Sequence, residues 1–243
     1  MIVEFIGSTG AGKTTLLKAV QRRLAETTHV TDSISLVTSR LGLRNVTNPT
    51  VQNLIQELVS LPFFIRSLHQ HQAFIVYTIR MFSRNSDFSI GTLNNLRSLE
   101  RKIGVYEIAR RHTHDQIILV DEGPILAAHM FVFTRASFTS EEIAQFASLV
   151  PLPDLVVYVR APIDTVIKRT LHRPDPPREM NSKSPALTES YVQGAATILD
   201  QLVEAAPIQC RLLIVENRDF TELGYHALVD DIAEYILKYR SPR

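Results

Sequence analysis

Short apolar runs alternate with longer amphipathic stretches along this chain, which is the pattern of strands that alternate with helices. The runs at 116–120, 155–159 and 212–215 read as buried strands, and 2–6 reads as a short strand at the start. A shorter run at 34–37 is the candidate for the second strand along the chain, with a weaker signal because it is short. Five strands separated by helices predict an α/β fold, with a five-stranded parallel sheet covered by helices on both faces.

Helix signals fill the spaces between these strands. Residues 14–25 carry apolar side chains on one face, which predicts an amphipathic helix directly after the first strand. Thr139 and Glu142 form a capping-box signature for a later helix. Pro162 is expected in the first turn of another helix, and Thr221 is expected to cap the last one.

The segment 51–114 has helical spacing over its whole length. Pro62, Asn85–Ser86 and Gly91 divide it into about three pieces. Because the segment is long for a plain crossover, we interpret it as a helical insertion over one edge of a single domain that spans 1–243. Its apolar part, 51–83, could pair with a second copy, so a homodimer is one expectation.

The connection after the first strand carries a complete phosphate-loop pattern, G-x-x-x-x-G-K-[ST], between a strand and a helix. Its backbone N–H groups and the start of the helix would face an anion, Lys13 would reach the β- and γ-phosphates, and Thr14 would ligate Mg²⁺. ATP and Mg²⁺ are therefore the expected cofactors. The predicted nucleotide-binding residues here are Gly7, Ser8, Thr9, Gly10, Ala11, Gly12, Lys13, Thr14 and Thr15.

A second acidic motif follows the apolar run that ends at Val120. Asp121 is positioned to hold Mg²⁺ directly or through water, although an Asp that merely ends a strand would look the same. Glu122 is the candidate general base, or the group that orients an acceptor hydroxyl. A surface glutamate in a turn is the alternative for Glu122.

Basic residues surround a proline-rich loop in the last third of the chain. Arg169, Arg173 and Arg178 are candidates to neutralise the charge that develops on a transferred phosphoryl group. Arg169 and Arg173 are four positions apart, which would put them on one helix face. A solvated basic helix end is the alternative, because cations are favourable there.

These motifs together resemble the thymidylate kinase and deoxynucleoside kinase group of phosphate-loop kinases. The resemblance rests on Gly7–Thr14, on Asp121-Glu122-Gly123-Pro124, and on Val157-Tyr158-Val159-Arg160-Ala161-Pro162 leading into Arg169, Arg173, Arg178 and Glu179. It implies five parallel strands with the phosphate-loop strand in the centre, and a mobile lid at 168–185. It also implies that the segment around Asn217 holds adenine, largely through backbone groups.

The chain departs from this group at the second acidic motif, where the group usually has an Asp-Arg or Glu-Arg pair and this chain has Asp121-Glu122. The acceptor therefore stays open among nucleosides, nucleotides, sugars, lipid-linked head groups and other small alcohols. The leading hypothesis is a small-molecule kinase. The alternatives are a regulatory ATPase without an acceptor and, with no concentrated basic stripe to support it, a kinase acting on a nucleic-acid end.

Bulk composition is consistent with a cytosolic protein. The formal net charge is +1, and Cys210 is the single cysteine, expected to be buried beside a strand, so no intrachain disulfide can form. No apolar run is long enough to cross a membrane.

Other polar residues have weaker signals. Asp32 could meet an acceptor or lie in a turn, and Arg40 and Arg44 could bind an anion or serve solubility. The pairs His69/His71 and His112/His114 lack the spacing of metal ligands, and the second pair is expected at a helix end.

Overall fold

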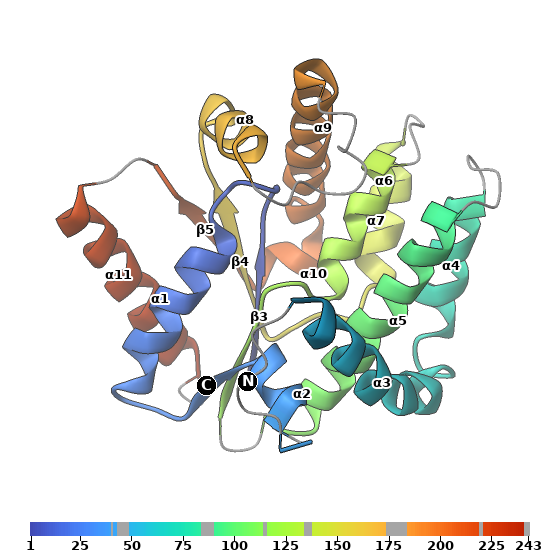
Figure 1. Ribbon diagram of the computed structural model, residues 1–243, viewed down its shortest axis with the longest axis horizontal. Helices are drawn as coiled ribbons and strands as arrows, with labels where there is room; N and C mark the ends of the chain where they lie inside the picture. Colours follow the sequence, from blue (N-terminus) through green and yellow to red (C-terminus); the bar gives the residue numbers. More distant parts are fainter. Residues whose placement is uncertain are drawn as a thin grey trace.

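The computed structural model describes residues 1–39, 41–42, 49–83, 90–113, 116–133, 138–173, 184–218 and 221–240. Its strands are β1 (Ile2–Ile6), β2 (Val30–Asp32), β3 (Ile117–Val120), β4 (Leu155–Arg160) and β5 (Leu212–Glu216). They form one parallel sheet in the order β2-β3-β1-β4-β5 (Figure 1). The predicted α/β fold is confirmed, and β1, which leads into the phosphate loop, is the central strand.

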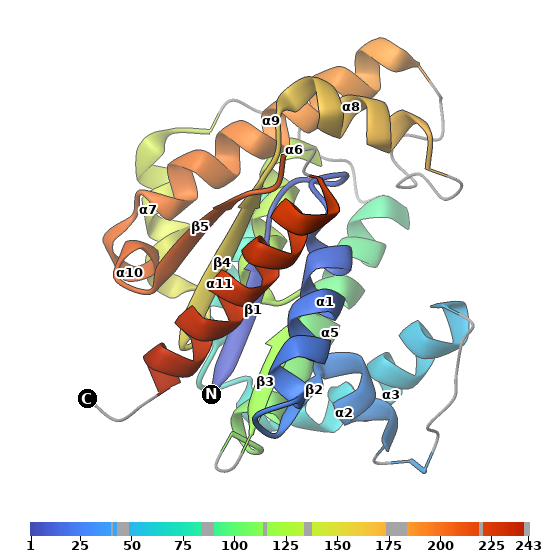
Figure 2. The same ribbon diagram turned by 90° about the vertical axis from the view of Figure 1, so that its left-hand side faces the viewer.

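Helices cover both faces of the sheet. Helices α1 (Lys13–Ala25) and α11 (Glu222–Arg240) lie together on one face, as Figure 2 shows. The remaining elements are α2 (Ser33–Ser39), α3 (Pro49–Ser67), α4 (Gln72–Ser83), α5 (Ile90–Arg110), the 3₁₀ helix η1 (Pro124–His129), α6 (Met130–Phe133), α7 (Ser140–Leu149), α8 (Ile163–Leu171), α9 (Pro185–Val203) and α10 (Ala206–Gln209). The second face carries α2 to α5, α7 and α9.

The central strand alternates between the two faces. Val3 and Phe5 pack in the cluster with α1 and α11, whereas Ile2 and Ile6 pack on the second face. The period of two places Glu4 on this second face as well, where its side chain is only 1% exposed. The strand therefore carries one buried carboxyl group into an otherwise apolar layer.

The predicted strand at 34–37 is wrong, because these residues lie in α2. The sheet uses Val30–Asp32 as β2 instead. Asp32 ends the strand and starts the helix, since its carboxylate accepts from the Ser35 N–H at 2.8 Å and from the Ser35 hydroxyl at 2.6 Å. A run of four residues fits both one helical turn and a short strand, and this cap decides for the helix. Asp32 is thus a capping residue.

Three helices make up the predicted helical insertion: α3, α4 and α5. Pro62 does not end a helix as predicted, because α3 continues through it. The proline is exposed, so the carbonyl group that it leaves without a helical donor can be hydrated. Gly91 likewise lies inside α5, and Asn85–Ser86 lies outside the described residues. Ile55 of α3 packs with Ile118 of β3, so the helices cover a face of the sheet and not only its edge.

Helix α3 also presents an apolar stripe to solvent. The spacing alternates between three and four residues, which is the spacing of a helix-pairing seam. Each of the following side chains is at least 43% exposed: Val51, Leu54, Leu58, Leu61 and Ile65. We call these five residues the α3 stripe.

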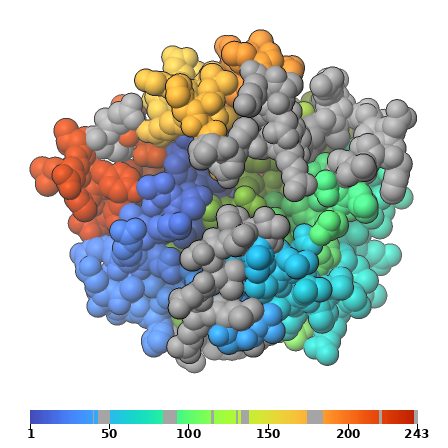
Figure 3. All heavy atoms as spheres, in the orientation of Figure 1, coloured from blue at the N-terminus to red at the C-terminus, as the bar shows by residue number. Residues whose placement is uncertain are grey.

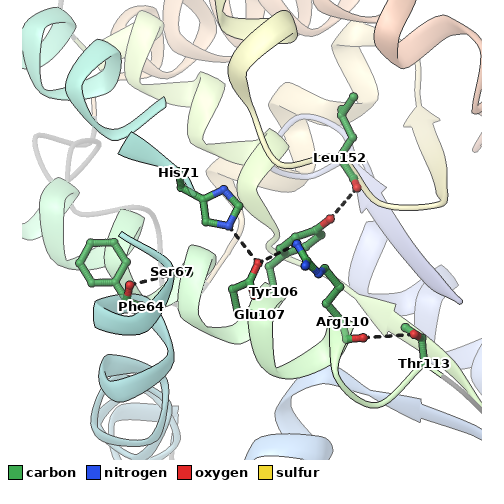
Figure 4. Close-up of polar contacts among 8 residues, drawn as sticks. All are labelled: Phe64, Ser67, His71, Tyr106, Glu107, Arg110, Thr113 and Leu152. Carbon is green, nitrogen blue, oxygen red and sulfur yellow. Dashed lines mark hydrogen bonds and ion pairs between the residues drawn. The ribbon is translucent and has the colours of Figure 1, made fainter. Parts of the chain in front are cut away.

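A buried polar cluster joins the turn after α3 to α5 (Figure 4). His71 Nε2 lies 2.9 Å from Glu107 Oε1, and both side chains are less than a tenth exposed. Arg110 donates to the same carboxylate oxygen at 3.4 Å. Burial raises the pKa of Glu107, but the hydrogen bond from His71 and the Arg110 charge outweigh it and lower that pKa overall. His71 therefore links the turn after α3 to α5. His112 Nδ1 lies 2.7 Å from the Ile108 carbonyl, near the end of α5.

The helix starts read from the sequence are largely confirmed. Thr139 and Glu142 form the predicted capping box of α7. The Thr221 hydroxyl accepts from the Gly224 N–H at 3.3 Å, at the start of α11. Pro162 is the residue before α8, one position earlier than predicted.

Cys210 follows α10 and is exposed, so the prediction of a buried cysteine is wrong. The residue lies in the connection that precedes β5 and does not enter the core. Among the described residues, no helix is both long and apolar enough to cross a membrane.

Candidate active site

Residues 7–12 connect β1 to α1 at the carboxyl edge of the sheet, as seen in Figure 2. Gly12 directly precedes α1 with φ of 90°, and a Cβ at this position would lie 2.3 Å from Asn217 Nδ2. Both the dihedral angle and the close neighbour exclude other residues. The loop turns back on itself through a hydrogen bond from the Ala11 N–H to the Ser8 carbonyl, 3.1 Å.

Lys13 begins α1 and reaches back across this loop. Its Nζ donates to the Ser8 carbonyl at 3.1 Å. Burial lowers the pKa of Lys13, whereas the charge of Asp121 opposes that shift. The amine is therefore held where a phosphate on the loop would meet it. Thr15, one residue after Thr14, is exposed on the first turn of α1.

Thr14 and Asp121 meet across the ends of β1 and β3. The Thr14 hydroxyl donates to Asp121 Oδ2 at 2.6 Å. Asp121 Oδ1 is buried, and no described residue supplies it with a hydrogen bond. A hydroxyl and a carboxylate suit Mg²⁺, which takes few protein ligands and keeps its waters and substrate phosphates. This donor set therefore fits the predicted metal.

Two contacts from distant elements brace the loop. Asn217 follows β5, and its side-chain amide donates to the Ala11 carbonyl at 2.7 Å. Its backbone N–H donates to the Arg160 carbonyl at 2.6 Å. The Thr170 hydroxyl on α8 donates to the Thr9 carbonyl at 3.0 Å. Asn217 therefore contacts the phosphate loop itself through its side chain.

The predicted arginines fall in different places. Arg169 lies on α8, with its Nη1 3.8 Å from where a Gly12 Cβ would be. Arg173 lies beyond the end of α8 at Leu171, so the two do not share a helix face as predicted. The charge of Arg173 adds to the burial effect that lowers the pKa of Lys13, which puts it near the loop. Arg178 lies outside the described residues, as does most of 168–185.

Glu122 is next to two cations from α5. Its Oε2 lies 3.7 Å from Arg101 Nη2 and 4.0 Å from Lys102 Nζ. The Lys102 charge lowers the pKa of Glu122, so the carboxylate is ionised at neutral pH. Its side chain is 59% exposed, whereas that of Lys102 is 10% exposed. No arginine adjoins Asp121 or Glu122 in the sequence. Arg101 and Lys102 of α5 supply positive charge beside Glu122 instead.

The loop after β3 rests on the buried carboxyl group of Glu4. A Cβ on Gly123 would lie 2.4 Å from Glu4 Cδ, so the backbone can approach only because residue 123 is glycine. The Leu126 N–H donates to Glu4 Oε1 at 3.3 Å. Burial raises the pKa of Glu4 to about 8, which keeps the group neutral at pH 7.

A cavity of about 120 Å³ opens beside Glu122, between α4, α5 and η1. It is lined by Phe82, Asn95, Ser98, Leu99, Lys102, Glu122, Leu126, Ala127 and His129. His129 Nε2 is buried and has no hydrogen-bond partner within the described part of the chain. Burial lowers the pKa of His129 to about 3, so the ring is neutral. Apolar and polar groups therefore face a small space next to the candidate base.

A larger cavity of about 530 Å³ lies beside the ends of β4 and β5, against α9. Asp200 accepts there from the Tyr158 hydroxyl at 2.9 Å and from Arg160 Nη2 at 2.6 Å. Its described lining includes Ser8 of the phosphate loop but neither Asp121 nor Glu122. The smaller cavity is therefore the one that adjoins Glu122, the candidate base.

Figure 3 shows the face of the molecule that carries α1, α8 and the helices of the insertion.

Sequence reasoning did not find Arg101, Lys102, Glu4, Thr170 or His129. A carboxylate inside the apolar strand 2–6 is a signal that could have drawn attention to Glu4. The other four residues have no local sequence signal of a functional role, because that role depends on where the fold places their helices relative to the loops after β1 and β3.

Comparisons with known proteins give a broad likeness. Neither protein-family models nor curated proteins match the chain. A shikimate kinase from Bacteroides thetaiotaomicron is similar in structure, with 12% identity, a TM-score of 0.45 and 98% of each chain covered. A deoxyadenosine kinase from M. mycoides with bound dCTP has 15% identity, a TM-score of 0.44 and coverage of 97% of this chain and 100% of that one. Scores this low carry no argument about the site.

Proposed function

We propose that this protein is a kinase that transfers the γ-phosphoryl group of ATP to a hydroxyl group of a small molecule. One observation carries the proposal: the Glu122 carboxylate lies beside a cavity at the same sheet edge as the phosphate loop and the Thr14–Asp121 pair. A nucleotide that merely binds or is hydrolysed has no need of a second, partly enclosed space beside the candidate base.

The residues have separate parts in the proposed reaction. The loop N–H groups and Lys13 bind the β- and γ-phosphates, while Glu122 accepts a hydrogen bond from the acceptor hydroxyl and takes its proton. Mg²⁺, held by Thr14 and Asp121, would neutralise charge on the phosphate oxygens. Arg169 and Arg173 approach the transferred group from the α8 side.

We assign a lid to 168–185 and acceptor binding to 51–114. Support for the lid comes from Thr170, whose hydroxyl contacts the phosphate loop directly. A lid that closes over the nucleotide excludes water and so favours an alcohol over hydrolysis. Adenine would lie between α8 and the residues after β5, with Asn217 beneath it. A cytosolic location remains part of the proposal.

Product analysis with γ-labelled ATP tests the function. A screen of nucleosides, nucleotides, sugars and small hydroxy compounds should yield one labelled acceptor. Lys13→Ala should abolish transfer in a folded protein, whereas Lys238→Ala, an exposed change on α11, should not. Glu122→Gln should lower kcat mainly, and Asp121→Asn should raise the Mg²⁺ requirement. Free phosphate as the sole product would indicate a regulatory ATPase, and a labelled polynucleotide a nucleic-acid kinase.

We further propose that two copies pair through the α3 stripe. Its three-four spacing supports a helix-to-helix contact with an identical stripe about a two-fold axis. Light scattering should give twice the 27.4 kDa chain mass for the natural protein and the single mass for Leu58→Glu. Leu223→Glu is the control, because Leu223 is more exposed, at 81%, but lies on α11. A natural protein of single mass would refute the dimer.

A further inference from the structure

The cavity beside Glu122 contains a buried cation that lacks a close counter-ion. Lys102 Nζ lies 4.0 Å from Glu122 Oε2, and this carboxylate also serves Arg101 at 3.7 Å. Lys102 Nζ donates a hydrogen bond to the Ser98 hydroxyl at 3.3 Å. Two cations thus share one anion, and neither is in close contact with it.

Besides Glu122, the surroundings supply one ionised carboxylate, Asp121, which also raises the pKa of Lys102 but lies outside the cavity lining. Glu122 is the single carboxylate among the described residues that line the cavity. Glu4 lies close enough to affect Lys102, but it is neutral at pH 7 because burial raises its pKa to about 8. Lys13 adds a further positive charge nearby, because it interacts with Lys102 and lowers the pKa of His129.

A buried ammonium group is costly unless a ligand or a partner compensates it. Around the cavity, Lys102, Arg101 and Lys13 outnumber the ionised carboxylates of Glu122 and Asp121 before a ligand enters. We propose that the acceptor carries an anionic group, a carboxylate or a phosphate, that Lys102 binds, while Arg101 keeps Glu122 in place for the hydroxyl. This inference rests on the proposed kinase function and specifies the chemical class of its acceptor.

Size restricts the acceptor further. An engineered cavity of about 150 Å³ admits a benzene molecule, so about 120 Å³ suits one ring or a short chain. Asn95, Ser98 and the unpartnered Nε2 of His129 offer hydrogen bonds to further polar groups. Because Glu122 and Lys102 are only 4.0 Å apart, the hydroxyl and the anion must be close together, as in a small hydroxy acid or hydroxyalkyl phosphate.

The transfer step balances with these groups. The acceptor oxygen forms a bond to the γ-phosphorus, the bond from that phosphorus to the β–γ bridging oxygen breaks, and ADP leaves. The hydroxyl proton passes to the Glu122 carboxylate. Lys102 keeps its proton and its contact with the anion throughout, so it acts in binding and takes no part in the proton transfer.

Binding of inorganic phosphate tests the anion site without turnover. The phosphate loop is first saturated with Mg·AMP-PNP, and labelled phosphate is then titrated by equilibrium dialysis. Lys102→Met should weaken phosphate binding by about 10- to 100-fold, the effect of losing a hydrogen bond to a charged group. Lys102→Arg should retain most of it. Equal phosphate binding by the natural protein and by Lys102→Met would overturn the inference.

A matched set of acceptors tests the class and separates its two forms. Glycerol, glycerate and glycerol 3-phosphate differ in the anionic group, and ADP release reports their use. We expect the glycerate or the phosphate ester to be used better than glycerol, with KM raised in Lys102→Met and kcat lowered in Arg101→Gln. Preference for glycerol would contradict the inference. Failure of the kinase function itself would show separately, as loss of Mg·AMP-PNP binding or as release of free phosphate only.

Discussion

The phosphate loop and the loop that follows β3 leave neighbouring strands at the same edge of the sheet, yet they are built differently. The phosphate loop presents backbone groups, and its shape depends on glycines and on contacts to its own carbonyl groups from Lys13, Thr170 and Asn217. The loop after β3 presents the side chains of Asp121 and Glu122. Burial and groups on α1 and α5 set the pKa values of these side chains.

This difference explains why the sequence predicts the phosphate-binding end of the site but does not predict the acceptor end around Glu122. A site made of backbone groups needs a fixed order of small residues, so it recurs as a motif. A site made of side chains needs only that charges meet in space, and helices from elsewhere in the chain can supply them. The acceptor end can therefore change its ligand without any change in the phosphate loop.

Gly12→Ala should have the largest effect on the transfer rate, because it changes the backbone of the phosphate loop itself. A Cβ would lie 2.3 Å from the Asn217 amide at a φ of 90°, so the loop must move. We expect the transfer rate to fall by about 10³-fold, as when an oxyanion-type donor is displaced. Gly42→Ala is the matched control, since Gly42 also has positive φ, 71°, with nothing within 4 Å. Equal losses in both variants would assign the effect to backbone strain alone.

Arg173→Ala should reduce kcat by about 10³-fold if this arginine acts on the transferred group. ATP binding should weaken much less, because the new charge appears only in the transition state. Lys238→Ala, an exposed change on α11, serves as the control in steady-state kinetics. Parallel measurements on Arg178→Ala complete the test. If neither arginine variant changes kcat by more than about twofold, the proposed lid fails.

Gly123→Ala should affect the other loop and leave the phosphate loop intact. The added methyl group would lie 2.4 Å from the Glu4 carboxyl carbon and would displace Glu122. We expect kcat to fall by about 10²-fold, the usual cost of a catalytic group misplaced by about 1 Å, while ATP affinity stays unchanged. The double variant Gly123→Ala with Glu4→Ala removes the clash and should regain part of the rate. Lost ATP affinity in Gly123→Ala would show that the two loops are not independent.

Glu4→Gln should have the smallest effect and should appear in stability. The folded protein keeps the Glu4 proton up to pH of about 8, whereas the unfolded chain releases it near pH 4.5. Within this window the free energy of unfolding therefore falls as pH rises, by about 1.4 kcal/mol per pH unit. Urea unfolding at pH 6 and pH 7 should show this loss in the natural protein and a smaller one in Glu4→Gln. Equal slopes would mean that Glu4 is ionised in the folded state.

Much of the fold could be predicted, because buried parallel strands and amphipathic helices leave clear periods in the sequence. The second strand could not, since 34–37 fits a helical turn as well as a strand and the Asp32 cap decides between them. The break after α3 was misplaced for a similar reason. An exposed proline is tolerated inside a helix, whereas the turn at 68–71 carries neither glycine nor proline.

The site divides in the same way. Lys13, Thr14 and Asp121 follow from the motifs and meet as expected. Arg101 and Lys102 could not be assigned, because a basic pair on a helix usually faces solvent, and only the crossing of α5 past the end of β3 brings it to Glu122. The helix face shared by Arg169 and Arg173 was wrong because α8 ends at Leu171.

The contact between Asn217 and the phosphate loop has a consequence for how the protein is made. Asn217 and Ala11 are 206 residues apart, so the contact closes almost the whole chain into a ring. Such distant pairs form late in folding, since ring closure costs more entropy as the ring grows. On the ribosome, the phosphate loop is synthesised first, but its contact with Asn217 can form only after β5 has been synthesised. We expect nascent chains arrested before residue 217 to ignore an ATP resin that full-length chains bind, and equal retention would show that the loop needs no such brace.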